Sequence, residues 1–369
     1  MDSVTQAVLG AAIGEALLGR KLGARGAAWG LLLGTLPDLD VVLSPMLDDV
    51  QELMLHRGPS HGVIILAVLT PVFAWLLMRM NRPVGYGRML AFVGLALGTH
   101  VLIDCFNVYG TQLLWPISKQ PFGMGNLFII DPLFTLPLLI GLIVAIRLKQ
   151  TSRARLVVIC IALGLSSLYV GASFAAKAKA TSIMASQLAE IGVLPDPLTN
   201  RYNLESGEEP ATLPRWQVAA TPFNILYWRA IAEQVSEDGV DGYWIGYVSL
   251  LDDPDQSVTF HYVPRNDRLL GGRADGRAMD ALRWFSHDFY GVRKVDDQLV
   301  VSDLRFGETT LGQEPPAING PSPFMFNFRL SDDGRTFNAV PSAEADWKSS
   351  LAFLWHRLRG RPADAFSPR

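Results

Sequence analysis

Long apolar runs fill the first half of the chain, and an alternating pattern of apolar and polar residues replaces them in the second half. A helix needs about 20 apolar residues to cross a bilayer. Five runs are about this long: 26–43, 62–80, 89–106, 127–146 and 156–175. A sixth run, 4–18, is shorter and contains Glu15, so it is a span, a half-span or a re-entrant helix. The pattern predicts an α-helical polytopic membrane domain of five to six helices over residues 1–175.

The second half carries the pattern of half-buried strands, bounded by turn residues. Four alternating runs are predicted to be strands: 243–250, 257–263, 298–306 and 324–330. Residues 176–194 and 278–289 are predicted to be helices. His261 and His287 lack ligand spacing and are predicted to be structural. We therefore expect a soluble α+β domain over residues 176–369, with a role in substrate binding, as a lid or in partner docking.

Composition supports this division. The chain has 369 residues, of which 49% are hydrophobic and 18% are charged, whereas soluble globular proteins carry about 25% charged residues. The lipid bilayer is thus the expected partner of the first half. The net charge is −3, and no basic patch argues for nucleic-acid binding. Cys105 and Cys160 both lie in apolar runs, so no disulfide framework is implied.

The basic residues of the first half predict its orientation. They occur in alternate connections between the apolar runs: Arg20, Lys21 and Arg25; Arg79, Arg82 and Arg88; and Arg147, Lys149, Arg153 and Arg155. Connections rich in Lys and Arg stay in the cytoplasm. The other connections and everything after Ala175 are then expected on the outer side of a bacterial inner membrane, which makes the C-terminal domain periplasmic.

Histidines and carboxylates gather at the predicted outer ends of the apolar runs. His100 and Asp104 are four residues apart, so on a helix they share one face. Imidazole and carboxylate groups are the ligands of catalytic zinc, manganese and iron. We predict that a divalent ion, zinc foremost with manganese or iron as alternatives, is bound by the following residues: Asp40, His61, His100 and Asp104. Asp38 is predicted as general base or as a hydrogen-bond partner of a ligand histidine, and His56 or Arg57 as groups that steady developing negative charge.

Each element also has a structural interpretation. The pair His100 and Asp104 is also compatible with a hydrogen bond inside one helix. His56 and Arg57 are equally read as residues that reach the membrane interface. Asp131 before Pro132 is predicted to cap a helix. A transporter or proton-relay protein is the alternative function, because acids and histidines in membrane segments often conduct protons.

The order of the motifs resembles a known family. Pro37-Asp38-Leu39-Asp40, His56-Arg57-Gly58-Pro59-Ser60-His61, His100 to Asp104 and Leu113-Leu114-Trp115-Pro116 are similar to the YdjM-type family, over about residues 1–140. Its members are bacterial inner-membrane proteins described as metal-dependent hydrolases. Gln6 stands where many relatives have a histidine, which leaves the roles of Asp2, Gln6 and Glu15 open. The resemblance also implies a distant likeness to zinc-dependent phospholipase C and related nucleases.

A hydrolase function combines these observations. The residues and the resemblance predict a membrane-bound metal-dependent hydrolase at the outer face of the inner membrane. A site at the boundary between membrane and water favours an amphiphilic, lipid-like substrate, such as a phosphoester or a lipid-linked ester. The alternative remains a non-enzymatic transporter or proton-relay protein.

Overall fold

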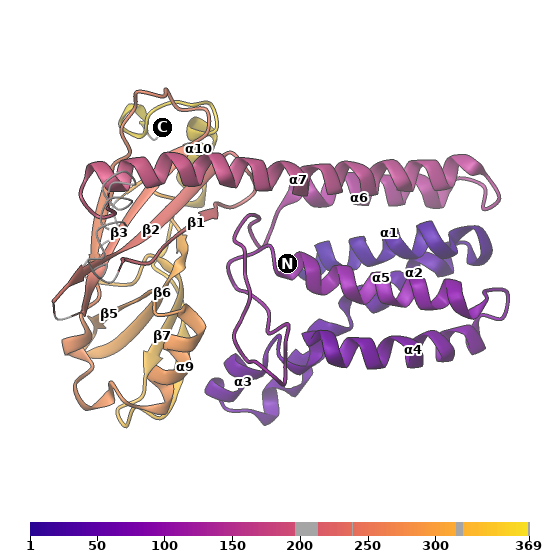
Figure 1. Cartoon of the computed structure of the whole chain (residues 1–369), viewed down its shortest axis with the longest axis horizontal. Coiled ribbons are helices and arrows are strands. Elements are labelled where there is room, and N and C mark those ends of the chain that lie inside the picture. The colour runs from indigo at the N-terminus through magenta and orange to yellow at the C-terminus, as the bar shows by residue number, and fades with distance from the viewer. Residues whose placement is uncertain (196–212, 238, 315–319, 368–369) are drawn as a thin grey trace, which may run out of the picture. The chain divides into compact units, whose positions relative to one another are not determined.

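A computed structural model describes residues 1–195, 213–237, 239–314 and 320–367 of the chain (Figure 1). The chain divides into two compact units. The first comprises Met1–Phe174 with Pro222–Asn224, and the second comprises Ala175–Thr221 with Ile225–Arg369. The long helix α7, Arg153–Glu190, contributes residues to both units.

The first unit is helical, as the sequence predicts. Its elements are α1 (Ser3–Leu22), α2 (Ala24–Thr35), η1 (Pro37–Met46), α3 (Asp49–Leu55), η2 (Pro59–His61), α4 (Val63–Met80), α5 (Tyr86–Asp104), α6 (Pro132–Arg147) and the first part of α7. By length and composition α4, α5 and α7 each suffice to cross a membrane. The pair α2 and η1, bent by 49°, is a fourth candidate span within the described residues, and α6 is a shorter apolar helix.

Glycines bring α1 and α2 into close contact. Gly10 and Gly14 on α1 face Gly26, Gly30 and Gly34 on α2. A Cβ atom at Gly30 would lie only 2.0 Å from the carbonyl oxygen of Gly10. Small residues at such spacing let helix backbones approach closely in membranes, where packing replaces the hydrophobic effect as the driving force. The two helices therefore form a rigid hairpin.

Three acidic residues of the first unit stabilise its helices. Asp2 is the N-cap of α1 and accepts hydrogen bonds from the amides of Val4 and Thr5. Asp131 caps α6, as predicted from the sequence. Glu15 is buried on α1 and forms an ion pair with Arg155 of α7. Asp2 and Glu15, whose roles the sequence left open, thus have helix-stabilising contacts.

The helices of the first unit place different chemistry at their two ends. Arg20, Arg79, Arg147 and Arg153 lie at helix ends that are joined by the short turns α1–α2, α4–α5 and α6–α7. The opposite end holds the N-terminus, α3 and the long connection from α5 to α6 (Figure 1). The basic residues and the candidate ligands therefore lie at opposite ends of the bundle.

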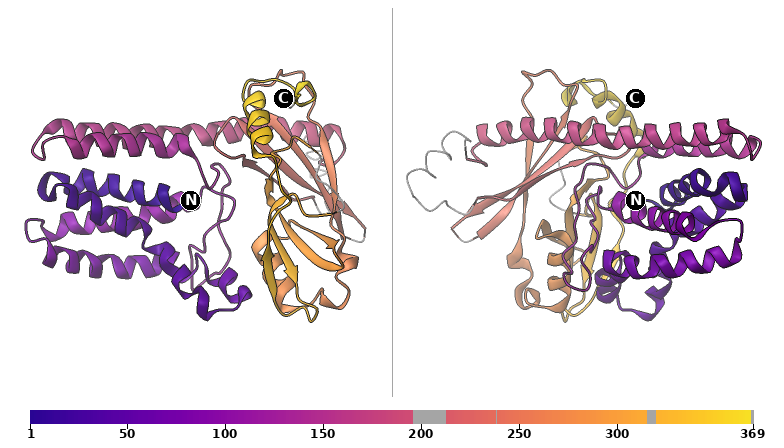
Figure 2. Two further views of the ribbon diagram at one scale, coloured as in Figure 1. Left: turned by 180° about the vertical axis from the view of Figure 1, so that it is seen from behind. Right: turned by 45° about the vertical axis from the view of Figure 1, so that its right-hand side comes forward.

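The second unit contains two four-stranded antiparallel sheets (Figure 2). The first is β1 (Trp216–Ala220), β2 (Tyr227–Ser236), β3 (Gly239–Ser249) and β4 (Phe260–Pro264), and the second is β5 (Tyr290–Val295), β6 (Gln298–Glu308), β7 (Phe324–Leu330) and β8 (Phe337–Val340), each in sequential order. The helices α9 (Arg277–Ser286) and α10 (Trp347–Arg357) complete the unit. Ala180 and Met184 of α7 pack with Trp228 and Val248 in one apolar core. The α+β prediction is confirmed.

Candidate metal centre

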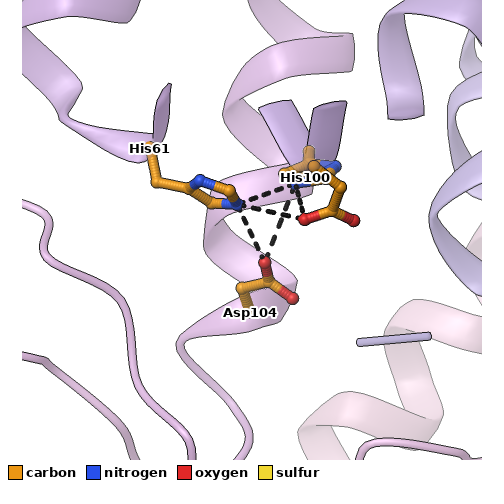
Figure 3. Close-up of side chains that lie close together, drawn as sticks. His61, His100 and Asp104 are labelled. Atoms are coloured by element: carbon orange, nitrogen blue, oxygen red, sulfur yellow. Dashed lines mark hydrogen bonds and ion pairs between the residues drawn. The ribbon is translucent and has the colours of Figure 1, made fainter. Parts of the chain in front are cut away.

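Four candidate ligand side chains converge at the end of the helix bundle that holds the N-terminus and α3. His100 and Asp104 occupy the last turn of α5, His61 ends η2, and Asp38 lies in the first turn of η1. Each offers one ligand atom, and these atoms lie within 4.8 Å of one another. Figure 3 shows the imidazoles of His61 and His100 and the carboxylate of Asp104 directed toward a common point.

The distances between these atoms suit a tetrahedral ion. Nε2 of His61 lies 3.1 Å from Nε2 of His100, 3.4 Å from Oδ1 of Asp38 and 3.3 Å from Oδ2 of Asp104. Nε2 of His100 lies 3.5 and 3.7 Å from the same two oxygens. Ligand atoms about 2.0–2.1 Å from a zinc ion at the corners of a tetrahedron are about 3.3–3.4 Å apart. The five distances that involve a histidine nitrogen lie close to this spacing, so the two imidazoles and either carboxylate can approach one ion.

Burial supports the same interpretation. The side chains of His61, His100 and Asp104 are fully buried. Oδ1 of Asp38 and Oδ2 of Asp104 are both buried and have no hydrogen-bond partner in the part of the chain that the structure describes. Buried carboxylate oxygens without a partner are costly, and in a native protein they call for a bound ion or water. A divalent cation between them would remove that cost.

Hydrogen bonds fix which nitrogen of each histidine faces the cluster. Nδ1 of His100 lies 2.6 Å from the carbonyl oxygen of Gly34, which can only accept a hydrogen bond. Nδ1 of His61 lies 2.9 Å from the hydroxyl of Ser60, which itself donates to Asp40 over 2.9 Å. Both rings therefore carry their proton on Nδ1 and direct an Nε2 lone pair to the cluster.

Gln6 holds the second oxygen of Asp104. Its amide donates to Oδ1 of Asp104 over 3.0 Å and to the backbone carbonyl of His100 over 3.2 Å. The amino group of Met1 donates to the same carboxylate oxygen. Gln6 therefore orients a candidate ligand from outside the cluster. The sequence left this role open.

The structure exchanges the expected positions of Asp38 and Asp40. Asp38 lies among the ligand atoms, whereas Asp40 accepts hydrogen bonds from the hydroxyl of Ser60 and the amide of Arg57 and contacts Nδ1 of His56. The two residues are two apart in a 3₁₀ helix of three residues per turn, so their side chains point about 120° apart. Only Asp38 can face the cluster.

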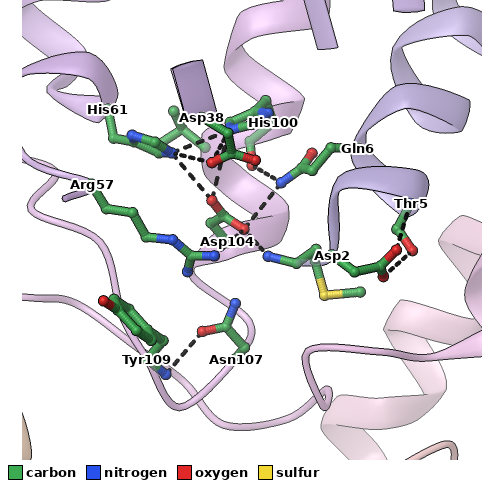
Figure 4. A network of polar contacts seen from close by, with 12 residues as sticks. Asp2, Thr5, Gln6, Asp38, Arg57, His61, His100, Asp104, Asn107 and Tyr109 are labelled. Carbon is green, nitrogen blue, oxygen red and sulfur yellow. Dashed lines mark hydrogen bonds and ion pairs between the residues drawn. The ribbon is translucent and has the colours of Figure 1, made fainter. Parts of the chain in front are cut away.

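Arg57 also lies near the site, as predicted from the sequence. It is 6% exposed, and its Nη2 lies 3.5 Å from Oδ1 of Asp104. Its guanidinium stands 4.7 Å above the ring of Tyr109. Figure 4 shows Arg57 on the side of Asp104 that faces away from the two histidines.

The carboxylates also act on the protonation of His61, which lies outside the candidate spans. Burial disfavours the charged imidazole, but the negative charges of Asp104 and Asp38, 3.3 and 3.4 Å from Nε2, outweigh burial and raise the pKa of His61 above its ordinary value. An ion must displace this proton, so metal binding is expected to weaken as pH falls.

Comparison with known proteins agrees with the order of motifs. Residues 1–180 match the family described as YdjM inner membrane protein. This region is YdjM-type. The chain is also 30% identical over 139 residues to the uncharacterized protein YfhP of Bacillus subtilis (strain 168). The aligned part covers 36% of this chain and 42% of that relative, so the chain spans less than half of the relative's length. No solved structure matches the chain significantly.

The family match and the apolar helices together make the chain a membrane protein. The YdjM-type region contains all four clustered side chains. It ends within α7, so both sheets of the second unit lie beyond it.

Proposed function

We propose that the chain is a membrane-bound metal-dependent hydrolase whose ion is held by Asp38, His61, His100 and Asp104. The supporting observation is the group of four converging ligand atoms within 4.8 Å of one another, two of them buried carboxylate oxygens without a hydrogen-bond partner among the described residues. Two imidazoles and two carboxylates suit zinc, and manganese and iron accept the same ligands. A divalent ion bound there would lower the pKa of a bound water and polarise an ester.

The surrounding side chains have separate tasks in this proposal. Asp40 contacts Nδ1 of His56 at 3.1 Å, which leaves Nε2 of His56 as the nitrogen that exchanges a proton with substrate or water. The side chain of His56 is 25% exposed, so water can reach it. Arg57 stands beside Asp104 as a positive charge that steadies negative charge on the substrate.

Metal analysis of the purified chain tests the proposal. We expect near-stoichiometric zinc, manganese or iron, and His100→Ala or Asp104→Ala should lose most of it, because three ligands remain. His56→Ala is the matched control, since it removes a neighbouring imidazole that is not among the four ligand atoms. It should keep the metal.

Activity supplies the second measurement. Hydrolysis of phosphoester or lipid-linked ester substrates should disappear with the metal and return when the ion is added back. Full metal loading in both ligand variants would contradict the hydrolase proposal and favour the proton-relay alternative. Under that alternative, the ligand variants should alter proton flux across vesicle membranes, and no hydrolysis would be there to lose.

We also propose that the site faces the periplasm. Most basic residues of the first unit, among them Arg20, Arg79 and Arg147, lie at the opposite end of the bundle from the four ligands, as the positive-inside rule requires of a cytoplasmic end. Reporter fusions after Arg82 should give a cytoplasmic signal, and fusions after Phe122 or Glu190 a periplasmic one. A cytoplasmic signal after Glu190 would reverse both the orientation and the periplasmic placement of the C-terminal domain.

A further inference from the structure

Three buried donor nitrogens on two side chains beside the candidate metal centre have no hydrogen-bond partner among the described residues. Nε and Nη1 of Arg57 are buried without an acceptor, and so is Nδ2 of Asn107, a residue that is 0% exposed. Figure 4 shows the guanidinium of Arg57 and the amide of Asn107 both turned toward Asp104. Unsatisfied buried donors are rare in native structures because each one costs free energy.

The chain holds both side chains firmly in place. Oδ1 of Asn107 accepts hydrogen bonds from the amides of Tyr109 and Gly110, so Nδ2 must point the other way. Arg57 has a positive φ of 57°, a conformation that non-glycine residues rarely adopt. Its amide donates to Asp40, and its carbonyl accepts from the amide of Gln112. A strained backbone fixed on both sides is typical of a functional position.

The charges around Arg57 and Asn107 indicate the sign of the charge on a ligand that these donors would bind. This step rests on the proposed metal site. When a divalent ion is bound, the carboxylates of Asp38 and Asp104 balance its two charges, and the charge of Arg57 is left without a counter-ion. Among the described residues, Arg57 forms an ion pair only with Asp104, at 3.5 Å. The arrangement therefore favours an anion with several acceptor oxygens.

We propose that Arg57 and Asn107 form a phosphoryl-binding subsite, so that the substrate is a phosphate ester and not a neutral carboxylic ester. A guanidinium offers parallel donors that match two phosphate oxygens, and a charge-assisted hydrogen bond of this kind is about twice as strong as a neutral one. The amide of Asn107 donates to a further oxygen. Arg57 contacts Oδ1 of Asp104, whose other oxygen is a candidate ligand, so a phosphate bound there would lie beside the candidate metal centre.

Anion titration of the purified chain tests the subsite. Metal-loaded protein in a neutral detergent is titrated with inorganic phosphate, and in a second arm with micelles that contain phosphatidic acid. Arg57→Gln and Asn107→Asp should each weaken phosphate binding about 10- to 100-fold. Asn107→Asp keeps the acceptor for Tyr109 and Gly110 and replaces the donor nitrogen with a negatively charged oxygen, which also repels phosphate. Arg82→Gln, which removes an exposed positive charge at the other end of the bundle, should change nothing.

The outcomes separate this subsite from the metal site. Binding in the first arm assigns the phosphoryl group to a soluble ester, and binding in the second arm alone assigns it to a lipid. Unchanged phosphate affinity in both variants, or acetate binding as tight as phosphate, would overturn the subsite. Metal analysis of the same samples reports the ion independently. Metal-free protein is also titrated, so a chain that loads no ion still reports whether Arg57 and Asn107 bind phosphate.

Discussion

The two units bury arginine–carboxylate pairs in different ways. In the second unit Arg229 donates to both oxygens of Glu308, at 2.9 and 3.3 Å, and to the hydroxyl of Tyr247 at 3.1 Å. In the first unit the nearest nitrogen of Arg57 is 3.5 Å from Asp104, and its Nε and Nη1 have no acceptor among the residues that the structure describes. The first pair is saturated by the chain itself. The second retains capacity for a ligand.

This difference separates structure from function within one chain. A saturated buried pair fixes a packing arrangement, and removing one partner leaves an uncompensated charge. In an unsaturated pair, burial has removed the polar groups from water without giving them protein partners. This desolvation cost is offset only when a ligand binds to them. Variants of matched residues in the two units should therefore behave differently.

The largest contrast is expected between Arg229→Met and Arg57→Met. Arg229→Met leaves the carboxylate of Glu308 buried without a counter-ion, which should destabilise the second unit by about 3–5 kcal/mol. Arg57→Met removes a weak contact and two unsatisfied donors, so its cost should be about 1 kcal/mol or less. Thermal unfolding with hydrogen exchange of each unit measures both. Equal losses of unfolding free energy in the two variants would contradict the distinction between the saturated and the unsaturated pair.

The next effect concerns the packing of the first unit. Gly30→Ala places a Cβ atom 2.0 Å from a backbone oxygen, and overpacking of this kind costs about 1–3 kcal/mol. Gly98→Ala on α5 is the control, because a Cβ atom there meets nothing within 4 Å. It should be neutral or stabilising by up to about 1 kcal/mol. A heat-stable Gly30→Ala protein would show that the glycine contact between α1 and α2 is not needed.

A smaller effect is expected from a single hydroxyl. Ser60→Ala removes the acceptor of Nδ1 of His61, and losses of this type cost about 10–100-fold in metal affinity. Ser302→Ala removes a buried hydroxyl of the second unit, which bonds to Ser322 and Asn327. It should leave metal affinity unchanged. Competition with a chelator of known affinity measures the metal affinity of both variants. Equal metal affinities would show that Ser60 does not support His61 in metal binding.

The smallest effect is a pH dependence of the second unit. Burial, with Arg305 and Arg215 nearby, lowers the pKa of His287 from 6.5 to about 4. Stability from neutral His287 is complete above pH 6.5 and is lost as pH falls toward 4, by about 1–2 kcal/mol given partial exposure. His287→Asn also tolerates the left-handed backbone, with φ of 52°, and should flatten this dependence between pH 7 and 4. An unchanged slope would assign the titration to other groups.

The sequence predicted elements that depend on local periodicity. The apolar runs mark the helices of the first unit, and the spacing of His100 and Asp104 places both on one face of α5. Strands β3, β6 and β7 follow the alternating runs, and β4 begins three residues later than expected, at Phe260. Strand β2 was not predicted: its first seven residues are all buried, so no alternation marks it.

The sequence could not decide contacts that depend on tertiary structure. Asp38 and Asp40 have similar neighbours in the chain, and only the 3₁₀ turn shows which one faces the histidines. Gln6 reaches Asp104 only through the packing of α1 against α5. The partner of Nδ1 of His100 is a backbone carbonyl, which no side-chain pattern can reveal.

Because its partner is a backbone carbonyl, the hydrogen bond of His100 responds differently to side-chain mutagenesis than the hydrogen bond of His61. Alanine scanning can delete the support of His61, because Ser60 and Asp40 act through side chains. It cannot delete the carbonyl of Gly34, and a Cβ atom at Gly34 would collide with the backbone of Gln6 at 2.5 Å. A scan would thus identify Gly34 only as a packing position and overlook its hydrogen bond to His100, a candidate ligand. Replacing its peptide bond with an ester would instead reach the hydrogen bond directly.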